Sequence, residues 1–284
     1  MSSQCDITYP ILRQPKQLRI DSIAKCNAKC LSCHRFLTKR KGEMPSELII
    51  QILKDVSRWD TPLEEIVPVN YGELFLRKDW EWLLNTIAQY LPKTMIVLPT
   101  NSSFFDTETI RALCQIPTVR IINFSVNAYF KETYEAFMGL KSEVMERLPS
   151  TISQIKALRP DIFLLASMVF DPQYQTDLER DAFVQFWKPI VLPQILAAAS
   201  AGRPDKSPAY SVKLPCRSIF SDIVVGYDRK ISSCCWDSNF SLDLGYYEGD
   251  LLRNWWSKEF VSFRELHNEH RRQELPLCCS CSFA

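Results

Sequence analysis

Glycine is scarce in this sequence, and its scarcity excludes one large class of binding sites. Only 7 of the 284 residues are glycine, and neither a G-x-G-x-x-G nor a Walker A pattern occurs. Both patterns use glycine to bring the backbone close to a phosphate group. The sequence therefore argues against a nucleotide site of either kind.

An excess of charge is also missing. The chain has 34 Lys and Arg residues against 33 Asp and Glu, a formal net charge of +1, so it has no general attraction for nucleic acid or an anionic membrane. No run approaches the roughly 18 apolar residues of a membrane span, and residues 1–16 lack the apolar core of a signal peptide,. We expect a cytoplasmic protein that binds neither nucleic acid nor membrane.

Cysteine, in contrast, is abundant and unevenly placed. Most of the 11 cysteines fall into two groups, one near each end of the chain, which favours metal binding over disulfides where nothing signals secretion. The first group, Cys26, Cys30 and Cys33, directly follows the strand-like run 18–23. Thiolates from such loops hold iron-sulfur cubanes, and three of them leave one iron open to another ligand. Zinc more often shows paired C-x-x-C knuckles or histidine partners.

Between the two cysteine groups, strand-like and helix-like stretches alternate. The predicted strands are 18–23, 65–70, 95–98, 120–126, 162–169 and 190–197,. The predicted helices are 46–56, 80–90, 106–114, one beginning near 131, 144–158 and one through 183–187,. Parallel neighbouring strands need a crossover connection such as a helix. The alternation therefore predicts an α/β fold with a parallel sheet.

The spacing of Cys26, Cys30 and Cys33 resembles the signature of the radical S-adenosylmethionine (radical SAM) superfamily. The resemblance implies a partial (βα)6 TIM-like barrel over residues 1–200, with a 4Fe-4S cluster on these three cysteines. In the superfamily, S-adenosylmethionine (AdoMet) chelates the open iron and is cleaved to a 5′-deoxyadenosyl radical. Catalytic residues of βα barrels gather at the carboxyl ends of the strands, so we expect the cofactor there.

One candidate cofactor motif follows the second predicted strand. Gly72 and Glu73 occupy the place of the superfamily's Gly-Gly-Glu-Pro motif, although Tyr71 replaces the first Gly and Leu74 replaces the Pro. The resemblance implies that this motif contacts the methionyl amino group of AdoMet. A carboxylate beside an ammonium group is a chemically sensible pair.

Two more candidate motifs follow the third and fourth predicted strands. The stretch 100–102, Thr-Asn-Ser, resembles a Thr-Asn-Gly turn of the superfamily, and 125–128, Ser-Val-Asn-Ala, resembles a stretch beside the AdoMet ribose and carboxylate. The resemblance makes Asn101, Ser125 and Asn127 cofactor-binding candidates. The alternative for each is ordinary turn chemistry at the end of a strand.

Two further positions each allow more than one functional interpretation. Ser32 stands where the superfamily usually has an aromatic residue near the adenine, and His34 or Phe36 is the candidate replacement. Arg203 follows the last predicted strand, and it either faces the substrate cavity as a catalytic residue or lies in a solvent-exposed loop.

The second cysteine group follows an irregular stretch, 201–215, that we interpret as a linker between domains. A predicted β-hairpin over 219–233 and a helix near 251–266 separate its members. This arrangement resembles a twitch domain, a shortened SPASM domain with one auxiliary 4Fe-4S cluster, over residues 216–284. The implied ligands are Cys216, Cys234, Cys278 and Cys281, with Cys235 and Cys279 as adjacent alternatives. A zinc site is the competing interpretation, because four cysteines also suit zinc.

Within the superfamily, the combination of a compact barrel, a Tyr-Gly-Glu motif and a four-cysteine twitch resembles the 2-deoxy-scyllo-inosamine dehydrogenases, which oxidise an alcohol of an aminocyclitol. The resemblance implies an oxidoreductase for a sugar-like small molecule, with AdoMet, two 4Fe-4S clusters and electron exit through the auxiliary cluster. An external one-electron reductant such as flavodoxin or ferredoxin is implied as a partner.

Two alternatives remain. The first is a maturase of ribosomal peptides that forms a crosslink, a thioether or an epimerised residue, with Cys235, Cys279 or Cys114 as a hydrogen donor for epimerisation. Such enzymes commonly carry an N-terminal peptide-binding domain, for which residues 1–16 leave no room. The second alternative is a non-catalytic metal-binding module, and AdoMet cleavage would separate it from both enzymes.

Overall fold

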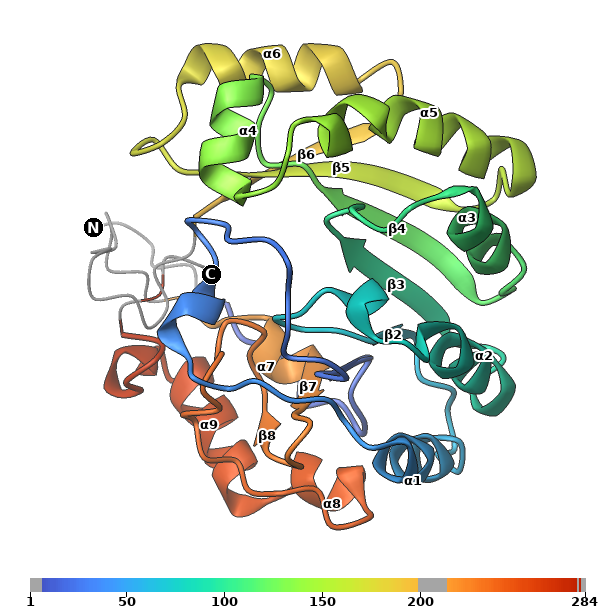
Figure 1. Cartoon of the computed structure of the whole chain (residues 1–284). Coiled ribbons are helices and arrows are strands. Elements are labelled where there is room, and N and C mark those ends of the chain that lie inside the picture. The colour runs from blue at the N-terminus through green and yellow to red at the C-terminus, as the bar shows by residue number, and fades with distance from the viewer. Residues whose placement is uncertain (1–6, 199–213, 280, 282–284) are drawn as a thin grey trace.

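One sheet runs through the part of the chain that the computed structural model describes, residues 7–198, 214–279 and 281 (Figure 1). Its eight strands have the order β6-β5-β4-β3-β2-β1-β7-β8. They are β1 (Gln17–Ile20), β2 (Glu65–Val67), β3 (Met95–Thr100), β4 (Val119–Ser125), β5 (Phe163–Phe170), β6 (Leu192–Ala197), β7 (Asp222–Val225) and β8 (Ile231–Ser232). Strands β1 to β6 pair in parallel in chain order, which confirms the predicted α/β fold.

Helices follow the strands and lie along the outer side of the curved sheet (Figure 1). They are α1 (Ser46–Val56), α2 (Trp80–Tyr90), α3 (Thr107–Cys114), α4 (Lys131–Met138), α5 (Glu143–Leu158) and α6 (Asp177–Trp187). The 3.6-residue period explains this placement; in α1, for example, the buried residues recur every third or fourth position,. The predicted bounds of α1 and α2 are correct. Helix α6 begins earlier than predicted, because the Thr176 side chain caps its first turn,.

The C-terminal hairpin continues this sheet. Strand β7 pairs in parallel with β1, and β8 pairs antiparallel with β7, so Val225 lies opposite Ile231. The predicted hairpin is confirmed in its pairing. Its first part is wrong, because residues 218–221 form the short helix α7 (Ser218–Ser221). The hairpin is thus part of the barrel sheet, at the open edge of β1.

The predicted helix over 251–266 is wrong as a single element. The structure divides it into α8 (Leu251–Trp255) and α9 (Lys258–Asn268), and the 3-10 helix η3 (Arg272–Glu274) follows. The side chain of Ser257 accepts a hydrogen bond from the backbone N–H of Phe260 and so caps a new helix,. An apolar period continues across the break, which is why the sequence pattern alone did not reveal it.

A buried arginine joins the C-terminal helices. Arg264 donates hydrogen bonds to the carbonyls of Ile219 and Trp255. Its guanidinium lies 3.7 Å from the centroid of the Trp255 ring and 4.3 Å from that of Phe260. Such cation-π contacts replace part of the lost hydration of the charge. This side chain therefore connects α7, α8 and α9 at one point.

The loop between β1 and α1, residues 21–45, carries the first cysteine group; we call it the cysteine loop. Its two ends run side by side. The N–H of Ala24 donates to the carbonyl of Gly42, and the N–H of Met44 donates to the carbonyl of Ser22, at 2.8 Å each. The base of the loop is thus a short antiparallel pair.

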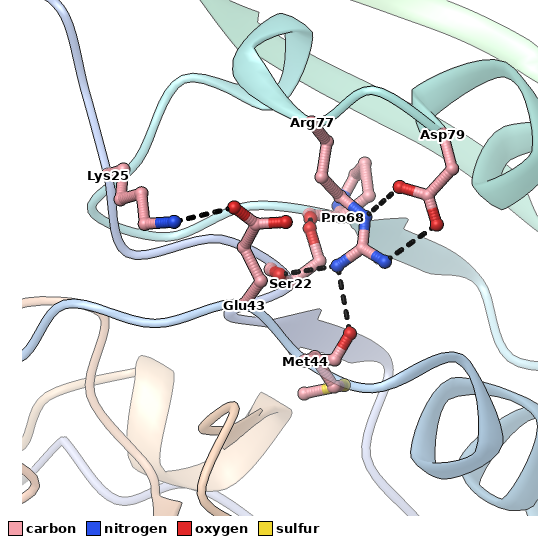
Figure 2. Close-up of polar contacts among 7 residues, drawn as sticks. All are labelled: Ser22, Lys25, Glu43, Met44, Pro68, Arg77 and Asp79. Carbon is pink, nitrogen blue, oxygen red and sulfur yellow. Dashed lines mark hydrogen bonds and ion pairs between the residues drawn. The ribbon is translucent and has the colours of Figure 1, made fainter.

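The side chain of Arg77 lies across this base. It follows the 3-10 helix η2 (Leu74–Leu76), and one terminal nitrogen donates to the carbonyls of Ser22 at 2.8 Å and Met44 at 2.9 Å (Figure 2). Asp79 binds the same guanidinium at 2.7 and 2.9 Å. Arg77 is only 3% exposed. One buried cation therefore ties both ends of the cysteine loop to the segment that connects β2 to α2.

In the described part of the chain, no helix is long and apolar enough to cross a membrane.

We expect Arg77→Met to lower the free energy of unfolding by about 3 kcal/mol, because it leaves two buried carbonyls without their charged donor. Urea unfolding measures the change. Lys25→Met is the matched control, since it removes an exposed ion pair with Glu43 at the same base and costs less than about 1 kcal/mol. Equal losses in the two variants would contradict the role of Arg77.

Candidate functional site

One cavity at the carboxyl ends of β2, β3 and β4 gathers the residues predicted for the first cluster and for AdoMet. We call it the first cavity. The predicted residues that line it are Cys26, Cys30, Cys33, Gly72, Glu73, Asn101, Ser125 and Asn127. The cysteines come from the cysteine loop, and the others follow three successive strands. Residues separated by a hundred positions in the chain thus share one wall.

Helix α4 holds the far side of the cysteine loop. The N–H groups of Lys29 and Leu31 donate to the carbonyls of Met138 at 2.7 Å and Phe137 at 2.9 Å. These carbonyls belong to the last turn of the helix, where no intrahelical donor reaches them. Gly139 ends the helix in the left-handed conformation with φ 62°,. The end of α4 therefore fixes the backbone around Cys30.

The thiols of the first cavity are poorly hydrated. Burial raises the pKa of Cys26 to about 11, and burial and the neighbouring cysteines raise the pKa of Cys30 further. Without a cation these groups stay protonated at neutral pH, whereas metal binding displaces the protons. The donor set, three soft thiols on one loop, fits an iron-sulfur cluster.

Glu73 is a buried carboxylate with no ion pair among the described residues, and it is 2% exposed. It accepts hydrogen bonds from the Thr100 hydroxyl at 2.9 Å and from the Asn101 N–H at 2.8 Å. Burial outweighs these bonds and raises the pKa of Glu73 to about 7. A buried anion of this kind is stabilised by a cation, so the first cavity suits a ligand with an ammonium group.

Gly72 packs directly against the backbone of the cysteine loop. A Cβ atom at this position would be 2.0 Å from the carbonyl oxygen of Ile23. The following N–H, that of Glu73, donates to the carbonyl of Lys25 at 2.8 Å. Only glycine permits this approach. Gly72 thus sets how closely the cysteine loop packs on the motif that carries Glu73.

Asn101 connects Glu73 to the cysteine loop. Its side-chain amide donates to the Asn27 side chain at 2.9 Å and lies 3.7 Å from the Cys26 sulfur. Ser102, next along the chain, has φ 61°, a conformation that favours glycine. This explains why the turn resembles Thr-Asn-Gly. Both features keep the turn in place beside the thiols.

Ser125 and Asn127 occupy the end of β4, as predicted, but the Asn127 side chain already has structural partners. Its oxygen accepts a hydrogen bond from the Val169 N–H at 2.7 Å, and its nitrogen contacts the sulfur of Met138 at 3.0 Å. With φ 59°, Asn127 turns the chain between β4 and α4. Ser125 lines the first cavity directly.

Aromatic rings form another wall of the first cavity. His34 lies in this wall, 4.9 Å from Trp236 and 6.2 Å from Tyr71 between ring centroids. Phe36, the other candidate for the adenine contact, is 56% exposed and is not part of the lining. Sequence reasoning missed Trp236, although its position beside two cysteines was an available signal. His34 is thus the candidate that the fold brings to the cavity.

A second cavity gathers the four predicted ligands of the auxiliary cluster. It is lined by Cys216, Cys234, Cys278 and Cys281. Neither of the adjacent alternatives, Cys235 or Cys279, is part of this lining, and both residues are described. The thiol of Cys279 is exposed and donates to the carbonyl of Pro276 at 3.1 Å.

Trp236 lines both cavities, so its side chain borders both groups of thiols. Two further residues of the second cavity, His267 and Arg272, were missed by sequence reasoning. Both are buried. Burial and the nearby Arg272 lower the pKa of His267 to about 4, so the imidazole is neutral. Nothing in the local sequence distinguishes them from other helix residues.

Arg203 lies outside the described residues. Within the residues that the structure does describe, no three His, Cys, Asp or Glu side chains converge closely enough to hold a single metal ion. The thiols instead line the two cavities.

Neither a family model nor a curated protein matches the sequence. Solved structures do match. BtrN in complex with AdoMet and 2-DOIA gives a TM-score of 0.69 at 18% identity, covering 94% of this chain and 93% of that chain. The protein anSMEcpe with bound AdoMet gives 0.69 at 15% identity, covering 94% and 89% of the two chains. SuiB of Streptococcus suis, bound to precursor peptide SuiA, gives 0.66 at 15% identity, covering 96% and 70%.

The chain has the fold of radical SAM enzymes. This finding confirms the predicted partial TIM-like barrel. The first cavity lies at the carboxyl edge of that barrel, where βα barrels place their active sites. Identities of 15 to 18% establish the fold alone, and the reaction must be argued from the site.

Glu73 makes stability depend on pH. Because its folded pKa, about 7, exceeds the ordinary value of 4.5, its contribution is complete below pH 4.5 and is lost as pH rises through 7. The difference corresponds to about 3 kcal/mol. We expect the free energy of unfolding of the metal-free protein to fall less over this pH range in Glu73→Gln, by about that amount, in urea titrations. Curves of equal slope would contradict the assignment, whatever their absolute levels.

Proposed function

We propose that this protein is a radical SAM enzyme that oxidises an alcohol of a sugar-like or aminocyclitol small molecule. The observation that carries the proposal is the composition of the first cavity. Three thiols spaced C-x3-C-x2-C meet a buried, unpaired carboxylate at the carboxyl edge of a barrel shared with AdoMet-binding proteins. A thiol-rich wall for a cluster and an anionic wall for an ammonium group are what AdoMet requires.

Each part of the first cavity has a proposed task. Cys26, Cys30 and Cys33 would hold a 4Fe-4S cluster, which, once reduced by an external one-electron donor and with AdoMet bound, would supply a 5′-deoxyadenosyl radical. Glu73 neutralises the ammonium group of AdoMet. Asn101 holds Glu73 and the cysteine loop in register through its backbone N–H and its side-chain amide. The ring of His34 covers the adenine in place of the aromatic residue that Ser32 replaces.

The second cavity is proposed to hold a fully ligated 4Fe-4S cluster, which supplies a one-electron carrier. Its ligands are Cys216, Cys234, Cys278 and Cys281. Oxidation of an alcohol to a ketone releases a proton and an electron after the hydrogen atom has left, so a nearby carrier suits this reaction. Trp236, which lines both cavities, supports a short path between them. The domains proposed from the sequence, 1–200 and 216–284, each contribute the cysteines of one cavity, although the barrel sheet continues into the second through β7. We propose flavodoxin or ferredoxin as reductant.

The likeness to BtrN in complex with AdoMet and 2-DOIA over nearly the whole of both chains supports a small-molecule substrate, as for a 2-deoxy-scyllo-inosamine dehydrogenase. A second candidate is peptide maturation, which the likeness to SuiB bound to its precursor peptide supports. That chain extends further, since this chain covers 70% of it.

One experiment tests the proposal. The anaerobically reconstituted protein is assayed for iron, sulfide and zinc, then reduced with AdoMet and either aminocyclitol alcohols or peptides. We expect about eight irons per chain, as two cubanes contain, and 5′-deoxyadenosine together with a ketone from an alcohol. Deoxyadenosine with a modified peptide would favour the second candidate. A protein that forms no deoxyadenosine with either class would contradict enzymatic AdoMet chemistry.

We expect Cys278→Ala to lose the auxiliary cluster and the ketone while it still forms some 5′-deoxyadenosine, because the first cavity is intact. Cys279→Ala is the matched control, since its thiol is exposed and outside the second cavity. Iron content and product analysis measure both effects. Normal ketone yield from Cys278→Ala would overturn the electron-carrier role.

A further inference from the structure

The hydrogen bond between Cys216 and His267 fixes the tautomer of a buried imidazole in the second cavity. The backbone N–H of Cys216 donates to Nδ1 of His267 at 3.0 Å. A nitrogen that accepts this bond carries no proton, so the proton of the neutral ring lies on Nε2. His267 is 1% exposed and sits on α9.

The Nε2–H group of His267 is an unused donor. It has no hydrogen-bond partner among the residues that the structure describes, and a buried donor without a partner is costly. His267 also cannot serve as a metal ligand through Nε2 in this tautomer. Ligation would move the proton to Nδ1, where it would face the N–H of Cys216. The structure therefore makes His267 a donor toward whatever the second cavity holds.

Arg272 adds a second unused donor and a positive charge. Its terminal nitrogens donate to the carbonyls of Leu214 and Cys281 at 3.0 Å each. Its Nε–H has no partner in the described part of the chain, and the residue is 1% exposed. The guanidinium group carries a positive charge. None of the described residues that line the second cavity is Asp or Glu, so the lining offers no counter-charge.

We propose that His267 and Arg272 donate hydrogen bonds to the sulfur atoms of a 4Fe-4S cluster in the second cavity and thereby raise its reduction potential. The inference rests on the proposed function for the presence of that cluster. Net charge and hydrogen bonds to the sulfurs set the potential of such clusters. Reduction adds one negative charge, which donors and a fixed cation stabilise. These two positioning residues make the cluster an electron acceptor.

Two substitutions of one residue test the inference. His267→Asn places an amide oxygen where Nδ1 lies, keeps the bond from Cys216, and removes the donor at Nε2. His267→Gln places an amide nitrogen near Nε2 and keeps that donor. The potential is measured by EPR-monitored redox titration of the full-length chain, anaerobically reconstituted in a Cys30→Ala background so that the auxiliary signal stands alone.

We expect His267→Asn to reduce the equilibrium constant for one-electron reduction about tenfold, which is 59 mV, and His267→Gln to change it far less. Arg272→Met is expected to shift the potential in the same direction, and Arg272→Lys less. Equal potentials in the Asn and Gln variants, or an unchanged potential in Arg272→Met, would overturn the proposal.

A chain that assembles zinc in the second cavity would also overturn it. The proposed function is tested separately, because 5′-deoxyadenosine formation by the wild-type chain depends on the first cavity and not on the potential of the second cluster.

Discussion

The guanidinium of Arg77 closes the base of the cysteine loop, and the rest of the site depends on this closure. Between Ser22 and Met44 the chain makes an excursion long enough to take many conformations. Two buried hydrogen bonds from one cation hold its ends together (Figure 2), while the last turn of α4 holds its middle. Gly72 then permits the segment between β2 and α2 to pack closely against the cysteine loop. These contacts together position the backbone that carries the thiols.

The two cavities differ in their charged side chains: both described linings include Arg, but only that of the first includes a carboxylate. The first contains the carboxylate of Glu73 without a described cationic partner, and the second contains the guanidinium of Arg272 without an acidic residue in its described lining. A ligand with an ammonium group suits the first, and a reducible cluster that gains negative charge suits the second. The shared wall at Trp236 keeps these environments adjacent but distinct.

The sequence predicted most of this fold because period and composition are local signals. Helices α1 and α2 have the predicted bounds, and the strand ends carry the predicted turns. The break at Ser257 was missed because the apolar period of the sequence continues across it. Only the capping hydrogen bond of the Ser257 side chain marks the start of a new helix. His267, Arg272 and Trp236 were missed for another reason: their roles arise from tertiary neighbours, such as Cys216 for His267. Cysteine spacing predicted the thiols that line the two cavities, but the residues around them could only be found in three dimensions.

The position of β7 beside β1 has a consequence for how the chain folds during synthesis. Strand β1 is made first, and β2 pairs with one of its edges early. Its other edge pairs with residues 222–225, which emerge from the ribosome only after strands β1 to β6. Until then the strand that leads into the cysteine loop presents an open edge, and such edges attract other chains. One edge of β1 therefore stays unpaired until β7 has been made, and the chain is most exposed to misassembly during that interval.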